Sequence, residues 1–265
     1  MREKIKVLGE WVKQSKSCVL FTGAGISTSA KIPDFRGPEG VWTLKAKGIA
    51  TSESLKLESA VPTPCHMAIV SLNTYFHNKQ RNFFVVSQNI DGLHRRSGLD
   101  KNLLSELHGN SFKEICWKCD KDYLRTFDTA ASSGLGGANC KECLARVPKF
   151  CHCTGRKCEC GAVLKDSIIH FGEDLPQVDL TNAIKRSSNA DLCIVLGSSL
   201  TVAPANTIPQ RTKKNGGKVV IVNLQETIHD GLADLRIFGK TDLVMQILAE
   251  ELGIQIPKFE LVNYF

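Results

Sequence analysis

Four short apolar runs constrain the fold of this chain most strongly, because each has the length of a strand and ends in small or polar residues. They are 18–21, 83–86, 192–196 and 219–222, and segments long enough for helices separate several of them. Runs of this kind are typical of strands buried on both faces of a parallel sheet. The sequence therefore predicts an α/β fold with a doubly wound, Rossmann-like parallel sheet.

Helical periodicity marks both ends of the chain. Apolar residues recur at helical spacing from Ile5 to Val12 and again over 241–252, where Gly253 supplies a stop signal. The first residues are charged and lack the apolar centre of an export signal, and no stretch has the apolar length of a membrane span. We therefore expect a soluble, intracellular protein with no membrane segment.

Cysteines change the character of the middle of the chain. Eight of the 11 lie between Cys116 and Cys160, in closely spaced pairs. Without an export signal, such pairs favour metal ligands over disulfides, and the segment has too few apolar residues for a core of its own. We predict a small zinc-binding module at 116–161, inserted into a sheet domain formed by 1–115 and 162–265.

Candidate ligand-binding residues follow the first two apolar runs. Small residues at 23–28 permit close backbone approach, and the N-terminus of a following helix can face a pyrophosphate. Thr28 stands where the Rossmann fingerprint has its third glycine, so this turn alone leaves a plain turn open. The polar segments 34–36, 87–92 and 107–110 strengthen the case for a nucleotide, because ligands of an open α/β sheet bind where strands end.

The order of the motifs resembles that of the sirtuin family. It runs GAGIST, IPDFRG, SQNIDGLH, LHGN, a cysteine pair, FGE, GSSL and VNLQ, and it covers residues 5–253. The stretches GPEGVWT and TGRKCECGAVLKDSIIHFGE are similar to the class IV branch, which contains chromatin-associated nuclear sirtuins. The resemblance implies an NAD-dependent protein-lysine deacylase, either a deacetylase or a long-chain deacylase, that releases nicotinamide and O-acyl-ADP-ribose.

The resemblance also assigns catalytic roles. The acyl oxygen of the substrate attacks C1′ of the nicotinamide ribose, and a base then deprotonates a ribose hydroxyl. His108 matches this base, and imidazole suits it because its pKa lies near the working pH; a structural hydrogen bond is the alternative. Asn89 and Asp91 would line the nicotinamide and ribose pocket, unless they only cap a strand end.

The residues next to the predicted dinucleotide are more numerous. Phe35 would shield the reacting centre, or be a core aromatic, and Arg36 would hold the pyrophosphate region, or form a surface ion pair. Thr241 would lie near the adenine, or be the N-cap of the last helix. The complete set assigned to NAD is Gly23, Ala24, Gly25, Ser27, Thr28, Asp34, Phe35, Arg36, Trp42, Gln88, Asn89, Ile90, Asp91, His108, Gly197, Ser198, Ser199, Asn223, Leu224, Gln225 and Thr241.

Substrate and zinc residues complete the assignment. A substrate peptide would pair with the backbone of a strand that carries His170, Phe171, Gly172 and Glu173. One structural zinc would be bound by Cys116, Cys119, Cys158 and Cys160. The second pair departs from the family spacing by one missing residue, which leaves Cys153 as an alternative to Cys158. A second zinc is a further expectation, with the ligands Cys140, Cys143, Cys151 and Cys153.

Partners and compartment follow less directly. The expected partners are acyl-lysine proteins, histone tails among them, and the net charge of +7 also suits nucleic acid or a nucleosome. Val41 and Leu44 disfavour a negatively charged acyl group, since desuccinylating relatives carry tyrosine and arginine there. We expect a nuclear protein, with the cytoplasm as the alternative. Two other functions stay open: protein mono-ADP-ribosyltransferase, and a chromatin- or RNA-binding module with weak catalysis.

Overall fold

A six-stranded parallel sheet forms the centre of the protein in the computed structural model, which describes residues 1–37, 40–49, 57–132, 141 and 150–260. Its strand order is β10-β9-β8-β1-β2-β3, so the chain starts in the middle and winds outward in both directions. The strands are β1 (Ser17–Thr22), β2 (Asn82–Ser87), β3 (Leu104–Glu106), β8 (Leu192–Leu196), β9 (Lys218–Asn223) and β10 (Leu235–Phe238). This order confirms the predicted doubly wound, Rossmann-like fold.

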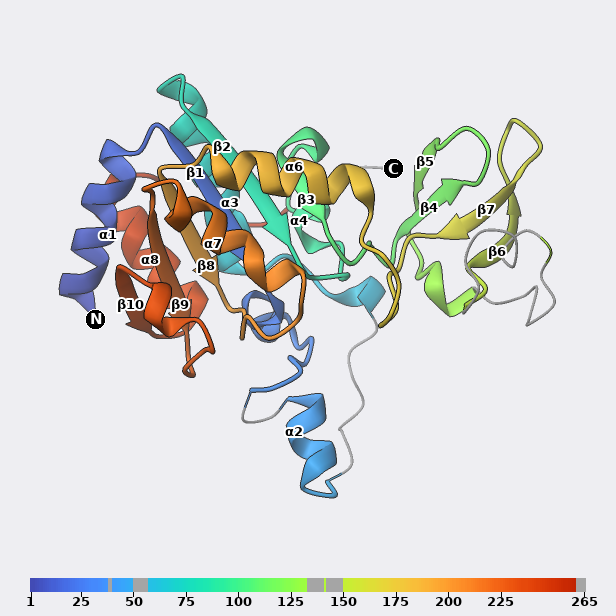
Figure 1. Cartoon of the computed structure of the whole chain (residues 1–265), viewed down its shortest axis with the longest axis horizontal. Coiled ribbons are helices and arrows are strands. Elements are labelled where there is room, and N and C mark those ends of the chain that lie inside the picture. Colours follow the sequence, from blue (N-terminus) through green and yellow to red (C-terminus); the bar gives the residue numbers. More distant parts are fainter. Residues whose placement is uncertain (38–39, 50–56, 133–140, 142–149, 261–265) are drawn as a thin grey trace.

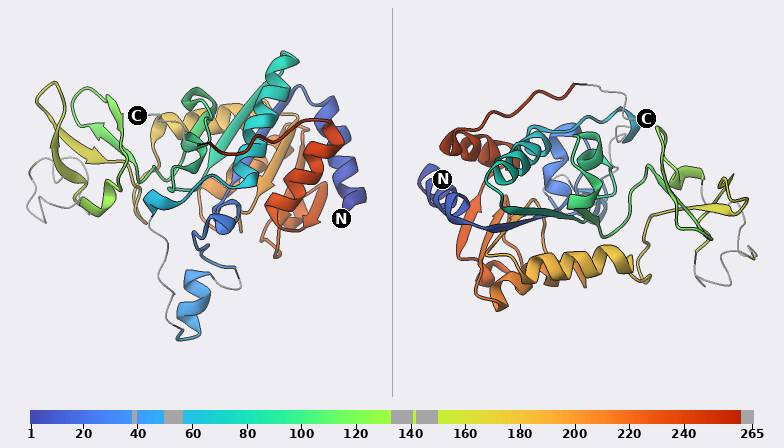
Figure 2. Two further views of the ribbon diagram at one scale, coloured as in Figure 1. Left: turned by 180° about the vertical axis from the view of Figure 1, so that it is seen from behind. Right: turned by 90° about the horizontal axis from the view of Figure 1, so that it is seen from above.

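Helices cover both faces of this sheet, as Figure 2 shows in the view from above. On one face lie α1 (Arg2–Gln14), α3 (Pro64–Asn78) and α8 (Thr241–Leu252), and on the other lie α6 (Gln177–Ser188) and α7 (Ile208–Lys214). Alternate residues of β1 enter the two cores, Cys18 and Leu20 on one side and Val19 and Phe21 on the other. The four apolar runs were therefore interpreted correctly as strands buried on both faces.

A second, antiparallel sheet lies at one end of the molecule (Figure 1). Its order is β5-β4-β7-β6, formed by β4 (Lys113–Cys116), β5 (Asp122–Leu124), β6 (Cys153–Lys157) and β7 (Val163–Asp166). Its apolar core is small, and the fully buried Glu114 joins its strands by ion pairs to Arg125 and Arg156, both at 2.6 Å. The module boundaries at 116 and 161 stay a prediction.

Two expectations about local structure were wrong. The residues 170–173 form a turn after the end of β7 rather than a strand, because Glu173 N–H donates to His170 O at 3.1 Å and Gly172 has a φ of +92°. The glycine-rich segment leads into two short 3₁₀ turns, Ala24–Ile26 and Thr28–Ala30, rather than an α-helix. Its bonds run from residue i to i−3, as in Ile26 N–H to Gly23 O.

Two short helices and the last helix complete the architecture. α2 (Val41–Ala46) projects from the body of the molecule, and α4 (Leu93–Arg96) follows β2 (Figure 1). α8 begins and ends as predicted, with Gly253 at a φ of +67° as its C-cap. Its N-cap is Lys240, so the alternative role of Thr241 as N-cap was wrong. Within the described ranges, none of the helices combines the length and apolar character of a membrane span.

Candidate active site

The predicted cofactor residues gather at the carboxyl ends of four neighbouring strands. The segments 23–28, 88–91 and 197–199 follow β1, β2 and β8, and the segment 223–225 begins at the last residue of β9. The sheet reverses its winding between β1 and β8, and this switch point is where open α/β sheets bind ligands. The fold therefore brings together motifs that lie as much as 200 residues apart in the sequence.

Three glycines join the turns after β1 and β8. A Cβ on Gly25 would lie 2.7 Å from Gly197 Cα, and one on Gly23 would lie 2.8 Å from Gly197 O. Gly23 N–H donates to Leu196 O at 3.0 Å, and Gly25 N–H donates to Gly197 O at 2.9 Å. The sequence predicted that these small residues allow a ligand to approach the backbone closely. In the structure they allow the two turns to pack closely against each other.

Backbone donors at this junction fit the phosphates of a dinucleotide. The N–H groups of Ala24, Ser198 and Ser199 make no hydrogen bond to another residue in the described part of the chain. Ser198 Oγ donates to Gln88 Oε1 at 2.7 Å, and Thr241 Oγ1 donates to Gly25 O at 3.3 Å, so both side chains lie beside the glycine turn. Free backbone N–H groups where strands end are the donors that bind a pyrophosphate in such folds.

A buried carboxylate organises the segment after β2. Asp91 Oδ2 accepts a hydrogen bond from Ser27 Oγ at 2.6 Å, and Asp91 Oδ1 accepts one from Leu93 N–H at 2.9 Å. Asn89 Nδ2 donates to Gly23 O at 3.2 Å and to Ser27 Oγ at 3.3 Å. Asp91 and Asn89 thus tie the segment after β2 to the glycine turn. Asp91 also caps the chain locally, which was the alternative interpretation of these two residues.

His108 lies half-buried in the loop after β3, with a defined tautomer. Its Nδ1 lies 2.9 Å from Gln88 O, and because a carbonyl oxygen only accepts, Nδ1 carries the proton. The lone pair is then on Nε2. Burial lowers the pKa of His108, and the hydrogen bond to Gln88 opposes this only in part, so the imidazole is neutral at pH 7. A neutral imidazole with an unprotonated Nε2 can act as a base.

The loop that carries His108 is held by the connection after β7, which the sequence did not reveal. Asn110 N–H donates to Ser167 Oγ at 3.0 Å, and Ser167 Oγ–H donates back to Asn110 O at 2.9 Å. Gly109 has a φ of +85°, and a Cβ there would lie 1.9 Å from Ser167 O. Ile169 N–H donates to His108 O at 3.1 Å. Residues 167–169 therefore fix the backbone from His108 to Asn110.

Exposed aromatic rings flank this region. The ring centroids of Phe35 and Trp42 are 5.5 Å apart, and those of Trp42 and Phe171 are 6.0 Å apart. Phe35 is 47% exposed and Phe171 is 74% exposed, so the alternative of Phe35 as a core aromatic was wrong. Arg36 stacks over Trp42, with its Cζ at 4.3 Å from the ring centroid, and no ion pair of Arg36 occurs among the described residues. The structure thus brings a predicted cofactor loop and the predicted substrate turn together.

The remaining predicted cofactor residues lie around these turns. Asp34 Oδ1 accepts from Gly37 N–H at 2.8 Å, and Ile90 O accepts from Ser111 N–H at 2.8 Å. After β9, Asn223 Nδ2 donates to Gln225 O at 3.1 Å, and Leu224 is exposed. Arg236 of β10 donates to the carbonyl oxygens of Asn223 and Gln225, a contact that no local sequence pattern indicates.

Two buried histidines lie behind the site, in a contact that no sequence pattern indicates. The ring centroids of His66 and His94 are 4.9 Å apart, and both residues are buried. His94 Nε2 lies 2.9 Å from Thr22 Oγ1, and His66 Nδ1 lies 2.8 Å from Thr63 Oγ1. Thr63 Oγ1 also donates to Ile26 O at 2.9 Å, so this pair supports the glycine turn. Burial lowers the pKa of each imidazole to about 3.

Four cysteines of the small sheet form a candidate metal centre. Cys116, Cys119, Cys158 and Cys160 place their Sγ atoms within 4.8 Å of one another. The Cys116–Cys160 and Cys119–Cys158 Sγ distances are 3.5 and 3.6 Å. Tetrahedral zinc with Zn–S bonds of about 2.3 Å needs sulfurs about 3.8 Å apart. The predicted ligand set is therefore the one brought together, and Cys153 does not replace Cys158.

Half of the predicted second zinc site lies outside the described residues. Cys140 and Cys143 lie outside the described residues, and Cys151 and Cys153 belong to no group of potential metal ligands within them. Cys18, Cys65 and Cys193 are buried in the core of the central sheet domain.

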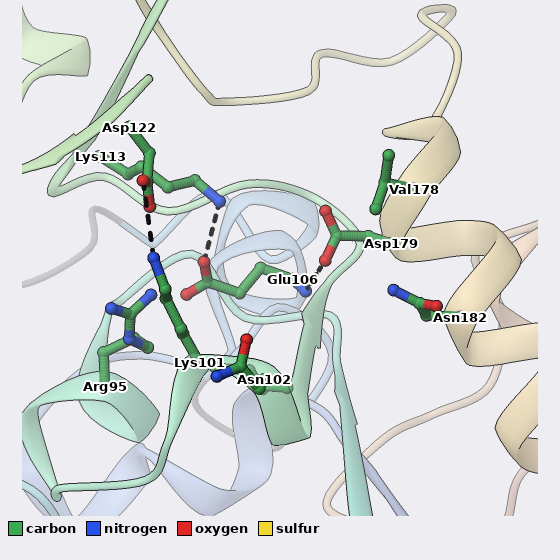
Figure 3. Close-up of a pocket in the computed structure, with 10 residues that line it drawn as sticks. Arg95, Lys101, Asn102, Glu106, Lys113, Asp122, Val178, Asp179 and Asn182 are labelled. Carbon is green, nitrogen blue, oxygen red and sulfur yellow. Dashed lines mark hydrogen bonds and ion pairs between the residues drawn. The ribbon is translucent and has the colours of Figure 1, made fainter. Parts of the chain in front are cut away.

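A polar pocket of about 270 Å³ lies away from the predicted site, between α4, β3 and α6 (Figure 3). Its charges are largely paired within the pocket: Lys113 and Glu106 are 3.0 Å apart, and Lys101 and Asp122 are 3.8 Å apart. Asp179 Oδ1 accepts from Glu106 N–H at 3.0 Å. None of the predicted site residues lines this pocket. The interactions of its lining residues hold the end of β3 in place instead.

Comparison with known proteins links this geometry to one family. The family described as the Sir2 family matches residues 45–204. The chain is 43% identical to "NAD-dependent protein deacetylase SRT1" of Arabidopsis thaliana, over 99% of this chain and 52% of that protein. It is 42% identical to "NAD-dependent protein deacetylase Sirt6" of Drosophila melanogaster, over 97% of this chain and 78% of that protein.

A solved structure shares the fold over almost the whole chain. The structure described as "Sir2-p53 peptide-NAD+" superimposes with a TM-score of 0.66 and is 34% identical, over 94% of this chain and 98% of that one. The chain spans about half the length of the two plant deacetylases named SRT1 that it matches.

Proposed function

The chain belongs to the Sir2 family, and from that premise we propose that it is an NAD-dependent protein-lysine deacylase which releases nicotinamide and O-acyl-ADP-ribose. The observation that carries the proposal is the state of His108. Its imidazole is neutral, its Nδ1–H is held by Gln88 O at 2.9 Å, and its Nε2 is left as the basic atom at the ends of the central strands.

The donors at the switch point would hold NAD. The free N–H groups of Ala24, Ser198 and Ser199 suit the pyrophosphate, while Asn223 and Thr241 lie where the adenosine half would extend. When bound, NAD supplies an electrophilic C1′ and the ribose hydroxyls that receive the acyl group. Asn89 and Asp91, held against the glycine turn by Ser27, would line the nicotinamide and ribose pocket.

His108 would remove a proton from a ribose hydroxyl through Nε2. Gln88 O fixes the tautomer, and the contacts of residues 167–169 with the loop fix the position of the ring. A base with this orientation accelerates proton transfer by about 10²- to 10⁴-fold. Phe35, exposed and next to Trp42, would cover the site from which nicotinamide leaves and exclude water.

The substrate peptide would bind along the turn 170–173. Phe171 is exposed and contacts Trp42, so the turn and the cofactor loop form one continuous apolar surface for an acyl-lysine. Val41 and Leu44 carry no charge, which disfavours a negatively charged acyl group. Acetyl and long-chain acyl groups both fit this description.

Zinc would be structural in this proposal. The four sulfurs of the small sheet have the spacing of a tetrahedral site, and all four ligand positions are supplied by protein, which leaves none for a substrate. The small apolar core of this sheet makes a metal cross-link its main source of stability.

Nuclear acyl-lysine proteins, histone tails among them, are the partners that we propose. The support is the similarity of GPEGVWT and TGRKCECGAVLKDSIIHFGE to the chromatin-associated branch, together with the net charge of +7, which also favours contact with nucleosomal DNA. Cytoplasmic substrates would be equally accessible to the chemistry.

A panel of acyl-lysine peptides with NAD tests the proposal. Mass spectrometry of the products should show free lysine peptide, nicotinamide and O-acyl-ADP-ribose in equal amounts. ADP-ribosylated peptide without deacylation would instead identify a mono-ADP-ribosyltransferase. Nucleic-acid binding with no product of either kind would identify the protein as a binding module. Each of these two results would overturn the proposal.

A further inference from the structure

Two histidines and a glutamate converge outside the four-cysteine cluster. His152 precedes β6 and is 5% exposed, while His170 and Glu173 belong to the turn after β7. One ligand atom from each of the three lies within 4.8 Å of the other two. None of these residues is shared with the cysteine cluster.

His152 is oriented as metal-binding histidines are. Its Nδ1 lies 3.1 Å from Asp166 Oδ1, and its Nε2 lies 2.9 Å from Glu173 Oε1. Metal-ligating imidazoles characteristically use the second nitrogen for a carboxylate, which fixes the tautomer and directs the free nitrogen at the ion. Asp166, 2% exposed, fills this place, and its Oδ2 has no hydrogen-bond partner among the residues described.

The cluster contains two buried carboxylates. The Asp166 and Glu173 side chains are 1% and 7% exposed, so two carboxylates are buried against a single His152 ring. Buried carboxylates are retained when they are paired or bind a metal. A divalent ion held between Nε2 of His152 and Oε1 of Glu173 would balance these two carboxylates.

We propose that His152, His170 and Glu173 form a second metal site, which binds a Zn²⁺ ion through two imidazole nitrogens and one carboxylate oxygen. A two-histidine, one-carboxylate set suits zinc and its transition-metal neighbours rather than calcium or magnesium, which prefer oxygen alone. These ligands differ from the cysteines that the sequence suggested for a second zinc. The proposal goes beyond deacylation and does not depend on it.

A small movement completes the geometry. Zn–N and Zn–O bonds of about 2.1 Å place tetrahedral ligand atoms about 3.4 Å apart, so no separation within the 4.8 Å limit needs to shorten by more than about 1.4 Å. His170 is the residue that can move, because it is exposed and its ring nitrogens bond to no other described residue. Its ring already stacks on that of His152, with centroids 5.2 Å apart.

The site would keep one coordination position open. Three protein ligands leave the fourth tetrahedral position to water or to a side chain of a bound protein. Glu173 and His170 belong to the same turn as Phe171, which contacts Trp42 at 6.0 Å. Two of the three ligands therefore lie on the turn along which a peptide is proposed to bind, and the ion would order that turn.

Zinc stoichiometry of the purified full chain tests the proposal. The protein is saturated with ZnCl₂ and freed of loosely bound metal, and its zinc is measured by mass spectrometry. We expect two zinc ions per chain for the wild type and one for His170→Ala, whose position is exposed and so leaves the fold intact. Glu173→Gln should also bind one, and Asp166→Asn should weaken the second site by about 10- to 100-fold.

The control is His77→Ala, which removes an exposed histidine elsewhere and should still bind two ions. One zinc in the wild type would overturn the proposal, as would two zinc ions in both His170→Ala and Glu173→Gln. Because the readout is bound metal, it is independent of whether the protein deacylates a peptide.

Discussion

Acid should destabilise this protein through His66 and His94. The two rings are 0% and 3% exposed, and burial lowers the pKa of each from 6.5 to about 3. For His94 the proximity of His66 adds to the effect of burial, and Asp91 opposes it. In the pH range in which these histidines begin to bind protons in the unfolded chain, both imidazoles are therefore still neutral in the folded protein.

The sign and magnitude follow from proton linkage. Because the folded pKa lies below the unfolded value, the unfolded state binds protons first as the pH falls. The contribution of the two histidines to the free energy of unfolding is complete above pH 6.5 and is lost progressively as the pH falls towards 3. Each histidine should lower the free energy of unfolding by about 1 kcal/mol between pH 6.5 and 5.5, and the pair by about 2 kcal/mol.

Urea unfolding at these two pH values, followed by circular dichroism, measures this loss. His66→Gln and His94→Gln should each reduce the pH-dependent difference by about 1 kcal/mol, even if they lower stability at neutral pH. The matched control is His77→Gln, which replaces an exposed histidine of α3 and should leave the wild-type difference unchanged. An unaltered difference in both buried-site variants would refute the reasoning.

Three further predictions concern the active-site loop and the metal. The acid limb of the kcat/KM profile should lie below pH 6.5, because burial lowers the pKa of His108; a limb above that value would contradict this. Gly109→Ala should cost about 2–5 kcal/mol in urea unfolding, since its Cβ would lie 1.9 Å from Ser167 O, and a neutral effect would be inconsistent with that contact. A zinc chelator should expose 113–124 and 153–166 to protease while α-helical circular dichroism persists; protection of these strands would count against a structural ion.

The sequence predicted most of the central sheet because its signals are local. A run buried on both faces is apolar at every position, so 192–196 and 219–222 could be recognised without knowledge of their neighbours. The last helix was equally clear, since its apolar face and Gly253 lie within one segment. The residues of the candidate site could be proposed from the sequence because their motifs come directly after these strands.

Contacts between distant segments could not be predicted in this way. Nothing near Ser167 in the sequence indicates that its hydroxyl holds the loop of Asn110, 57 residues away. His152 stands alone among cysteines in the sequence, and only the pairing of β6 with β7 brings it to Glu173. The strand at 170–173 was expected from the family resemblance, and the turn found there, with Gly172 at a φ of +92°, could not be predicted from that resemblance.

The central claim is that Nε2 of His108 takes the proton which allows the acyl group to leave lysine. Rapid-quench measurement of nicotinamide and O-acyl-ADP-ribose, with His108→Ala beside wild type and His77→Ala, tests it most directly. The proposal predicts that His108→Ala still binds NAD but forms O-acyl-ADP-ribose at least about 100-fold more slowly, while His77→Ala matches the wild type. Formation of O-acyl-ADP-ribose by His108→Ala at the wild-type rate would contradict it.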